Sequence, residues 1–308
     1  MTWVSWRLQR TETLIALGIL ALLAALLIPT GIQMANAYHQ DGLGACLSIN
    51  TPTCGHELSA FQQRFQALTT LGNWFTLIPG LIGVLLAAPF ILELEHGTYR
   101  LAWTQSITRG RWLLGKLALP TATALVAAGT LTLLFTWWRT PNVHINGRLD
   151  IGNYDTTGTV VVGYTLFALA LALALGAIWR RAAASLTVAV VGYFTMRVFV
   201  DYWLRDHLVP PLKATYEGAQ QPHFLYNAHV LSMDGTVNGH QFSTAGGGGF
   251  LGGHVQVATP GMSHALFHVV YQPESHFWPL QLTETGLFVG LAAILILFAA
   301  WWTHQRAT

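Results

Sequence analysis

Two histidines in the last third of the chain have the spacing of a metal-binding pair. His264 and His268 lie four residues apart, which would place both imidazoles on one face of a helix. Neutral imidazoles are common ligands of zinc and copper, and His254 and His276 would be further ligands. No carboxylate lies at metal-motif spacing, so the alternative is that these are ordinary polar histidines of an external segment. We therefore expect no metal site, and His264 and His268 are the candidates should one exist.

Two glycine-containing stretches imitate nucleotide-binding motifs. Residues 110–116, Gly-Arg-Trp-Leu-Leu-Gly-Lys, match the first seven positions of a phosphate-binding P-loop, but Leu117 stands where magnesium needs a hydroxyl group. Gly247, Gly249 and Gly252 satisfy the dinucleotide pattern without the strand and helix that it requires. No Ser–His–Asp or Cys–His arrangement stands out at recognisable spacing. The sequence therefore predicts a chain that is not an enzyme and does not itself hydrolyse ATP.

Three charged residues lie in or beside apolar stretches. Arg197 and Asp201 are four residues apart, and Glu284 stands near the start of the last apolar stretch. A charge at the centre of a bilayer costs roughly 2.5–3.5 kcal/mol on insertion scales, so pairing along one helix face is expected. These intramembrane polar residues have two interpretations. They form either a local ion pair near the membrane surface or polar contacts in a substrate path.

The chain contains two cysteines, Cys46 and Cys54, eight residues apart in a polar stretch. That spacing is too wide for the C-x-x-C pair of a zinc or redox site. A local disulfide is expected if the stretch lies outside the cytoplasm. Two unpaired thiols are the alternative.

The composition requires a surface that faces lipid. Of the 308 residues, 53% are hydrophobic and 9% are charged, whereas soluble domains carry roughly 25% charged residues. The mean hydropathy is +0.45. The formal net charge is only +2 and no dense basic run follows, so no nucleic-acid partner is expected. The low fraction of charged residues also excludes a soluble enzyme.

Six stretches are long and apolar enough to cross a membrane, which takes roughly 20 residues. They cover residues 14–32, 74–92, 117–138, 160–179, 182–203 and 286–302. Tryptophans fall at their ends, as at Trp74, Trp138 and Trp179, where the indole ring prefers the headgroup layer. The sequence thus predicts an all-α polytopic membrane protein with six transmembrane helices.

The distribution of Lys and Arg predicts the orientation of these spans. Nine of these residues fall in the N-terminal segment, the two short loops and the tail, and five fall in the longer opposite loops. Cytoplasmic loops carry the excess of Lys and Arg, so both termini are predicted to be cytoplasmic. Arg7, Arg10 and the Ala-Asn-Ala sequence at 35–37 also resemble a secretory signal with a cleavage site. The apolar run is longer than such signals have, so we expect it to remain as the first span.

The segments between the spans divide the chain into nine parts. They are an N-terminal amphipathic segment with the first span (1–35), an external loop with the cysteine pair (36–73), the second span (74–92), a cytoplasmic segment (93–116), the third span (117–138), an external loop (139–159), the fourth and fifth spans (160–203), a large external loop (204–280), and the sixth span with a cytoplasmic tail (281–308). The first and third external loops are expected to build an extracytoplasmic cap.

The short segment between the second and third spans has the sequence ELEHGTYRLAWTQSITRGRWLLGKLAL over residues 93–119. This pattern is typical of a helix that leaves the membrane at Glu93 and Glu95, breaks at Gly97 and continues as a short amphipathic helix. Its last cations, Lys116 among them, would meet lipid phosphates. The alternative is an ordinary solvated loop.

This segment resembles the signature of ABC-2 type permeases, the membrane subunits of type-2 ABC exporters. That signature has an acidic residue, a Gly-Thr pair, a Ser-x-Thr-Arg turn and a Gly-Lys pair that opens the next span. The matching positions are Glu93 and Glu95, 97–98, 106–109 and 115–116. The resemblance extends to the topology of the whole chain, with an amphipathic start, six spans and the largest external loop before the last span. The chain is most similar to bacterial members.

The resemblance implies the permease subunit of an ATP-driven ABC exporter in the bacterial cytoplasmic membrane. Such a subunit moves an amphiphilic substrate (drug, antibiotic, lipid or peptide) by alternating access. In this family the 93–116 segment is a coupling helix that docks on a separate ATPase. The residues implied in partner coupling are Glu93, Glu95, Gly97, Thr98, Tyr99, Arg100, Trp103, Ser106 and Arg109.

The implied partners are two copies of an ABC ATPase subunit, a second copy of the permease and membrane lipid. ATP and magnesium would be bound by the ATPase, so this chain is expected to hold no cofactor. Two other functions fit parts of the sequence. One is a membrane-embedded metal- or haem-handling protein that uses the external histidines, and the other is a sensor or accessory protein with the permease fold.

Overall fold

The computed structural model describes residues 2–49, 52–98, 108–217, 227–237, 240–245 and 266–306. The described chain is mostly helical. Its helices are α1 (Thr2–Gln40), α2 (Leu43–Ile49), α3 (Pro52–Trp74), α4 (Ile78–Glu95), α6 (Arg109–Asn146), α7 (Ile151–Thr156), α8 (Val160–Trp179), α9 (Ala182–Phe199), α10 (Arg205–Leu208) and α11 (Phe277–Arg306). Single turns of 3-10 helix at Phe75–Leu77 and Glu274–His276, and one π-helical turn at Val200–Leu204, join some of them.

Six helical runs are long and apolar enough to cross a membrane, and each contains one predicted span. They include α1, α4, α6, α8, α9 and α11, which confirms the prediction of a multi-pass helical membrane protein. The helices run well beyond the apolar stretches. α3 lies in the segment predicted as the first external loop, and α6 continues to Asn146. Hydropathy marks the part of a helix that suits lipid, whereas backbone hydrogen bonding continues through polar residues beyond it.

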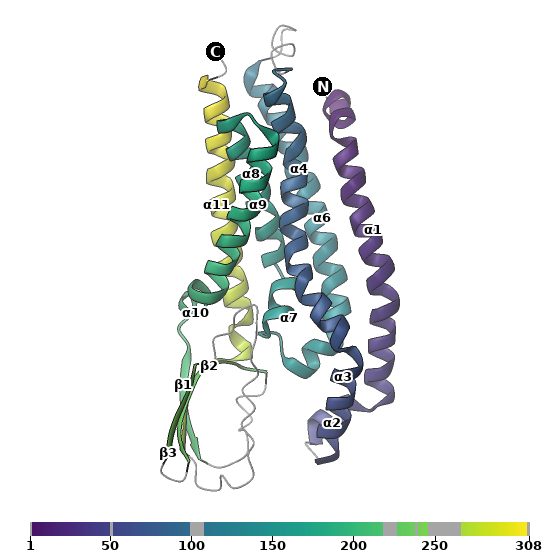
Figure 1. Ribbon diagram of the computed structural model, residues 1–308, viewed down its shortest axis with the longest axis vertical. Helices are drawn as coiled ribbons and strands as arrows, with labels where there is room; N and C mark the ends of the chain where they lie inside the picture. Colours follow the sequence, from purple (N-terminus) through teal and green to yellow (C-terminus); the bar gives the residue numbers. More distant parts are fainter. Residues whose placement is uncertain are drawn as a thin grey trace.

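The long helices stand side by side, and the connections gather at their two ends (Figure 1). Both chain termini lie at one end, together with the end of α4, the start of α6 and the turn between α8 and α9. We call this the terminal end. α2, α3, α7 and the strands lie at the opposite end, which we call the sheet end.

α8 is the central helix of the bundle. It packs against α4, α6, α9 and α11, and most of its side chains are buried. Small residues allow its closest approach to α4: Gly83 faces the backbone carbonyl oxygen of Thr165, and Gly176 faces the side chain of Ile91. Glycine at such positions lets two backbones pack more closely than larger residues permit.

An antiparallel sheet of four strands covers part of the sheet end. The strands are β1 (Leu212–Glu217), β2 (His229–Val237), β3 (His240–Ala245) and β4 (Leu266–Gln272), in the order β1-β4-β2-β3. Phe267, Val269 and Tyr271 alternate into a small core of their own on one face. The helix expected around His264 and His268 is therefore wrong at His268, which lies on β4 within this alternation. His264 lies outside the described residues.

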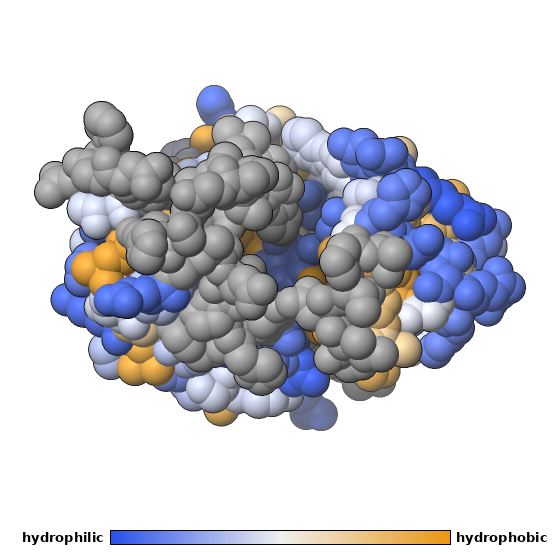
Figure 2. Space-filling view, turned by 90° about the horizontal axis from the view of Figure 1, so that it is seen from below, coloured by the Kyte–Doolittle hydropathy of each residue, from blue (hydrophilic) through white to orange (hydrophobic). Residues whose placement is uncertain are grey.

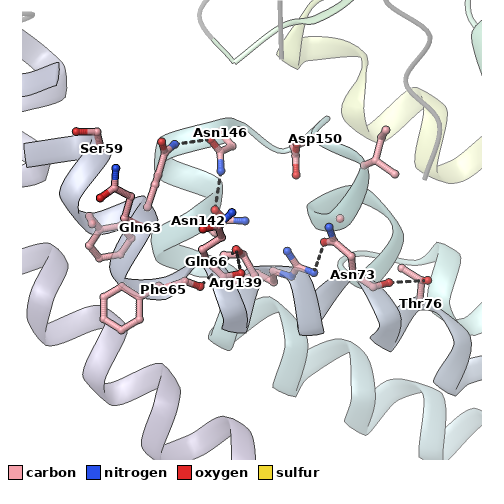
Figure 3. Close-up of a pocket in the computed structure, with 15 residues that line it drawn as sticks. Ser59, Gln63, Phe65, Gln66, Asn73, Thr76, Arg139, Asn142, Asn146 and Asp150 are labelled. Carbon is pink, nitrogen blue, oxygen red and sulfur yellow. Dashed lines mark hydrogen bonds between the residues drawn. The ribbon is translucent and has the colours of Figure 1, made fainter. Parts of the chain in front are cut away.

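A cavity of about 580 Å³ opens at the sheet end between α3, α6 and the start of α7 (Figure 3). Seen from this end, the centre of the molecule is hollowed and its visible floor is hydrophilic (Figure 2). Glutamine and asparagine amides from α3 and α6 make up much of the cavity wall.

The close contact between α4 and α8 predicts a specific sensitivity to side-chain size. A Cβ atom at Gly83 would overlap the backbone oxygen of Thr165, which cannot move without moving the helix. We expect Gly83→Ala to lower the free energy of unfolding by about 1–3 kcal/mol, as overpacking does. Gly129→Ala on α6 is the matched control, because a Cβ there meets nothing within 4 Å. Equal melting temperatures of the two purified variants would contradict this packing.

Candidate functional site

The 93–116 segment is fixed at its two ends by contacts of Glu93 and Lys116. Glu93 lies in the last turn of α4 and Lys116 in the second turn of α6, and the two side chains form a close ion pair. Both are nearly buried, with 12% and 11% of their side-chain surfaces exposed. Lys116, which we expected to meet lipid phosphates, has the carboxylate of Glu93 as its partner in this structure.

Glu95 connects the same segment to a different helix. Its Oε2 atom accepts a hydrogen bond of 2.9 Å from the backbone N–H of Ala182, the first residue of α9. The first N–H groups of a helix have no partner within it, and a carboxylate is favourable beside them. Glu95 therefore ties the end of α4 to the start of α9.

The chain turns away from α4 directly after this contact. α4 ends at Glu95, and Gly97 has a φ angle of 69°, which is a conformation that glycine adopts readily. The hydroxyl of Thr98 lies 3.5 Å from the backbone oxygen of Glu93. The break predicted at Gly97 is thus present.

The remaining residues predicted for partner coupling fall on the connection itself. Tyr99, Arg100, Trp103 and Ser106 lie outside the described residues. Arg109 is the first residue of α6. The structure therefore brings together Glu93, Glu95, Gly97 and Thr98 at the end of α4.

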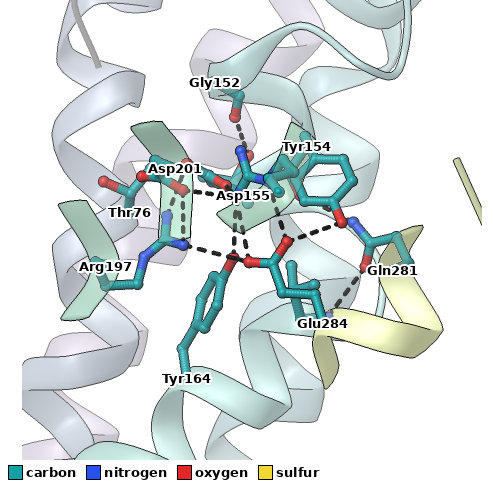
Figure 4. Close-up of polar contacts among 12 residues, drawn as sticks. Thr76, Gly152, Tyr154, Asp155, Tyr164, Arg197, Asp201, Gln281 and Glu284 are labelled. Atoms are coloured by element: carbon teal, nitrogen blue, oxygen red, sulfur yellow. Dashed lines mark hydrogen bonds and ion pairs between the residues drawn. The ribbon is translucent and has the colours of Figure 1, made fainter. Parts of the chain in front are cut away.

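A cluster of five charged side chains is buried at the sheet end of the bundle (Figure 4). It contains two guanidinium groups and three carboxylates, each with at most 11% of the side-chain surface exposed, from α7, α9, the π-helical turn, α10 and α11: Asp155, Arg197, Asp201, Arg205 and Glu284. The local pair expected between Arg197 and Asp201, 3.0 Å apart, is one contact within this larger cluster.

Each arginine in the cluster binds more than one carboxylate. Arg197 Nη2 lies 2.7 Å from Asp155 Oδ2, and Arg205 Nη2 lies 2.7 Å from Asp155 Oδ1. Arg205 also reaches Asp201 Oδ1 at 2.6 Å and, through Nε, Glu284 Oε2 at 3.1 Å. The contacts of Arg205 are also hydrogen bonds, and hydrogen bonds between charged partners are the strongest in proteins, whereas Arg197 and Asp155 form an ion pair. Asp155 is therefore shared between the two guanidinium groups.

The third carboxylate, Glu284, is stabilised by neutral donors as well as by cations. The phenol groups of Tyr154 and Tyr164 both donate hydrogen bonds to it, the first at 3.0 Å. Burial and the charge of Glu284 raise the pKa of Tyr154, so its O–H remains a donor. Two guanidinium groups alone would leave one of three carboxylates without a counter-charge, and the tyrosines supply the missing stabilisation.

Sequence patterns singled out three of the five charges, Arg197, Asp201 and Glu284, but not Asp155, Arg205 or the two tyrosines. Asp155, Tyr154 and Tyr164 lie at the junction of α7 and α8, and Arg205 stands beyond the fifth predicted span. One signal was present, because Arg205 follows Asp201 by the same four residues that separate Asp201 from Arg197. Residues four apart share a helix face, so three alternating charges on one face required further partners.

The two other predicted features are simpler. Cys46 of α2 and Cys54 of α3 form the predicted disulfide at the sheet end, with Cα atoms 5.3 Å apart. His268 Nδ1 lies 2.9 Å from the Thr215 hydroxyl on the neighbouring strand β1. Within the described ranges, no group of three or more His, Cys, Asp and Glu side chains is placed to hold a metal ion.

The cluster predicts that replacing a buried arginine lowers the free energy of unfolding much more than replacing an exposed one. Arg205→Gln would leave three buried carboxylates with one guanidinium group. Breaking a buried ion pair from one side costs about 3–5 kcal/mol. We expect that loss in the free energy of unfolding, measured by denaturant in mixed micelles. Arg148→Gln is the control, since Arg148 is 49% exposed and 3.7 Å from Glu274, and should lose under about 1 kcal/mol. Equal losses would argue against the cluster.

His229 at the start of β2 predicts that the stability of the fold depends on pH. It lines a small pocket with Tyr154, Arg205 and Asp201, and burial, with a smaller effect of the Arg205 charge, lowers the pKa of His229 to about 4. An unfolded histidine has a pKa of about 6.5, so the unfolded state binds the proton first as the pH falls. The stabilising contribution is complete above about pH 6.5 and is lost toward about pH 4.

The melting temperature of the wild type minus that of His229→Gln should therefore decrease between pH 7 and pH 4.5. A difference that does not change with pH would contradict the partly buried, neutral state of His229.

Residues 17–205 match the family described as ABC-2 membrane transporter related. Neither the comparison with curated proteins nor that with solved structures gives a match. The matched region runs from α1 to the start of α10 and contains the 93–116 segment and four of the five clustered charges. Membership implies an ABC ATPase subunit as partner. Because the match covers more than half of the chain, the chain belongs to the ABC-2 membrane transporter related family and is a permease subunit of an ABC transporter.

Proposed function

We propose that this permease subunit works in an ATP-driven exporter of the bacterial cytoplasmic membrane and moves an amphiphilic substrate by alternating access. The observation that carries the proposal is the attachment of the 93–116 segment to three helices. Glu93 binds Lys116 of α6, and Glu95 binds the first N–H group of α9. A displacement of this segment by a partner would therefore move the ends of α4, α6 and α9 together.

α9 offers the route by which that displacement reaches the opposite end of the bundle. Its first residue, Ala182, is bound by Glu95, and Arg197 near its last turn enters the charge cluster. The cluster in turn holds Asp155 of α7 and Glu284 of α11. Packed interfaces rearrange between discrete arrangements rather than deforming gradually. We infer that α9 acts as the lever between the coupling segment and the external side.

The orientation that this mechanism requires places the terminal end in the cytoplasm. The Cys46–Cys54 disulfide at the sheet end supports this, because disulfides persist in oxidising compartments. Arg180 and Arg181 lie at the terminal end, where an excess of basic residues favours the cytoplasm. The cap of the sheet end, built around α2, α3 and the sheet, would then be extracytoplasmic.

The proposed assembly contains two copies of this chain and two ATPase subunits. ATP and magnesium would be bound and used by the ATPase, and this chain would not act as an enzyme. In support, residues 110–116 form the first turns of α6 and Lys116 binds Glu93, whereas a phosphate-binding P-loop is a turn outside a helix with a lysine that reaches phosphate. Amphiphilic cargo suits a path between apolar and aromatic helix faces.

The proposal predicts that Glu95→Gln uncouples the two halves of the complex. The variant keeps the shape of the side chain but removes the charge that binds the N–H group of Ala182. We expect transport to fall about tenfold, which corresponds to one charge-assisted hydrogen bond. The measurement is ATP-dependent uptake of a fluorescent amphiphilic amine into inside-out vesicles that contain this chain and its ATPase.

Glu57→Gln on α3 is the matched control, because Glu57 is an exposed glutamate at the sheet end. Both variants should co-purify with the ATPase in wild-type amounts, so that a loss of transport reports coupling rather than assembly. Wild-type transport by Glu95→Gln would refute the coupling role. Uptake in right-side-out vesicles alone would refute export.

A further inference from the structure

The cavity at the sheet end contains a third buried arginine, which the transport proposal does not use. Arg139 of α6 is 1% exposed and lines the cavity between Gln66 and Asn73 (Figure 3). Two glycines make room for its guanidinium group. A Cβ atom at Gly72 would lie 2.8 Å from Nη2, and one at Gly152 would lie 3.0 Å from Nη1.

Amide oxygens, rather than carboxylates, hold this guanidinium group. Nη2 donates to Asn73 Oδ1 at 3.2 Å, and Nη1 lies 3.5 Å from Asn153 Oδ1. Asn142 donates to the same oxygen of Asn153 at 3.0 Å, and Asn146 donates to Asn142 at 2.6 Å. The amides thus form one hydrogen-bonded chain that ends at Arg139.

The charge of Arg139 has no direct counter-ion among the described residues. No carboxylate oxygen there lies within 4.0 Å of it, in contrast to Arg197 and Arg205, and its Nε has no hydrogen-bond partner in that part of the chain. Asp150, which also lines the cavity, and Asp155 of the charge cluster act on Arg139 only from beyond ion-pair distance. A buried cation without a paired anion is costly, and an anion bound in the cavity would offset that cost.

The position of the cavity relative to the membrane surface indicates which anion is available to bind there. Trp74 directly follows Asn73 in the chain and is 55% exposed. Trp137 lies two residues before Arg139 and is 45% exposed. Exposed tryptophans at the ends of membrane helices mark the headgroup layer, where lipid phosphates lie. Arg139 therefore lies near the level of phosphate groups. Its planar fork matches the oxygens of a phosphate better than a lysine would.

We propose that the cavity binds a phosphate ester through Arg139. The anion binds at the edge of the guanidinium group that borders the cavity, and the amides of Gln62, Gln66 and Asn146 bind the polar remainder of the molecule. The chemistry is the same for a phospholipid headgroup and for a soluble phosphate ester. The site requires only the sheet end of the fold, so it does not depend on the direction of transport.

Binding to the purified, delipidated full chain in detergent tests the proposal. Calorimetric titrations use sn-glycerol 3-phosphate and dihexanoyl phosphatidylglycerol, with glycerol and dihexanoylglycerol as phosphate-free counterparts. We expect the phosphate probes to bind and their counterparts not to bind. Binding of both phosphate probes identifies a soluble ester as sufficient, and binding of the acylated probe alone identifies a lipid headgroup. No binding of either phosphate probe overturns the proposal.

Two variants locate the binding. Arg139→Gln should weaken it about tenfold or more, whereas Arg148→Gln, at an exposed arginine of the same end, should not. Because Arg139→Gln removes a buried group and could fail to fold, Gln66→Glu provides a second test. It places a carboxylate beside Arg139 from an exposed side chain and should weaken binding similarly. Gln40→Glu adds the same charge at an exposed position away from the cavity. Equal affinities of these two glutamate variants overturn the proposal.

Discussion

The sharing of Asp155 between two buried arginines constrains the whole sheet end of this protein. Moving a charge out of water costs several kcal/mol even after relaxation, and the cost is offset only when every charge meets partners with good geometry. Here the partners come from α7, α9, the adjoining helical turns and α11. None of these elements can shift alone without exposing an unpaired charge. The elements therefore move as one unit or exchange partners together.

Among the described residues, fewer polar contacts join the helices at the terminal end than in the charge cluster. Glu93 and Glu95 supply the polar links from α4 to α6 and α9, and Glu95 lies at the surface. The many ion pairs at the sheet end and the few polar links at the terminal end make the two ends differ in how easily their helices can be displaced. Force applied near the light links displaces helix ends, and the displacement is resisted at the cluster. The alternating access that we propose would use this difference, because one side must open while the other remains closed.

The six spans were predictable because their signal is local, whereas the cluster depends on tertiary structure. A run of apolar residues and its flanking tryptophans mark a span without reference to the rest of the chain, and eight residues suffice to predict the Cys46–Cys54 bridge. Asp155 and Glu284 are far apart in sequence, and only the packing of α7 against α8 and α11 brings them together. The sheet was missed because half-buried strands in a polar segment give a weak alternation. At His268 the four-residue spacing suggested a helix, although it is equally compatible with a strand.

Three buried arginines in one chain show how differently a protein can accommodate the same group. Arg197 and Arg205 lie against carboxylates and over the rings of Tyr164 and Tyr154, so their charge is neutralised within the fold. Arg139 lies among amide oxygens that solvate its charge without neutralising it. A carboxylate at Asn73 or Asn153 would neutralise this charge within the fold, at the cost of its own desolvation. The amide contacts leave the positive charge without a direct counter-ion among the described residues, beside the cavity in which we propose that an anion binds.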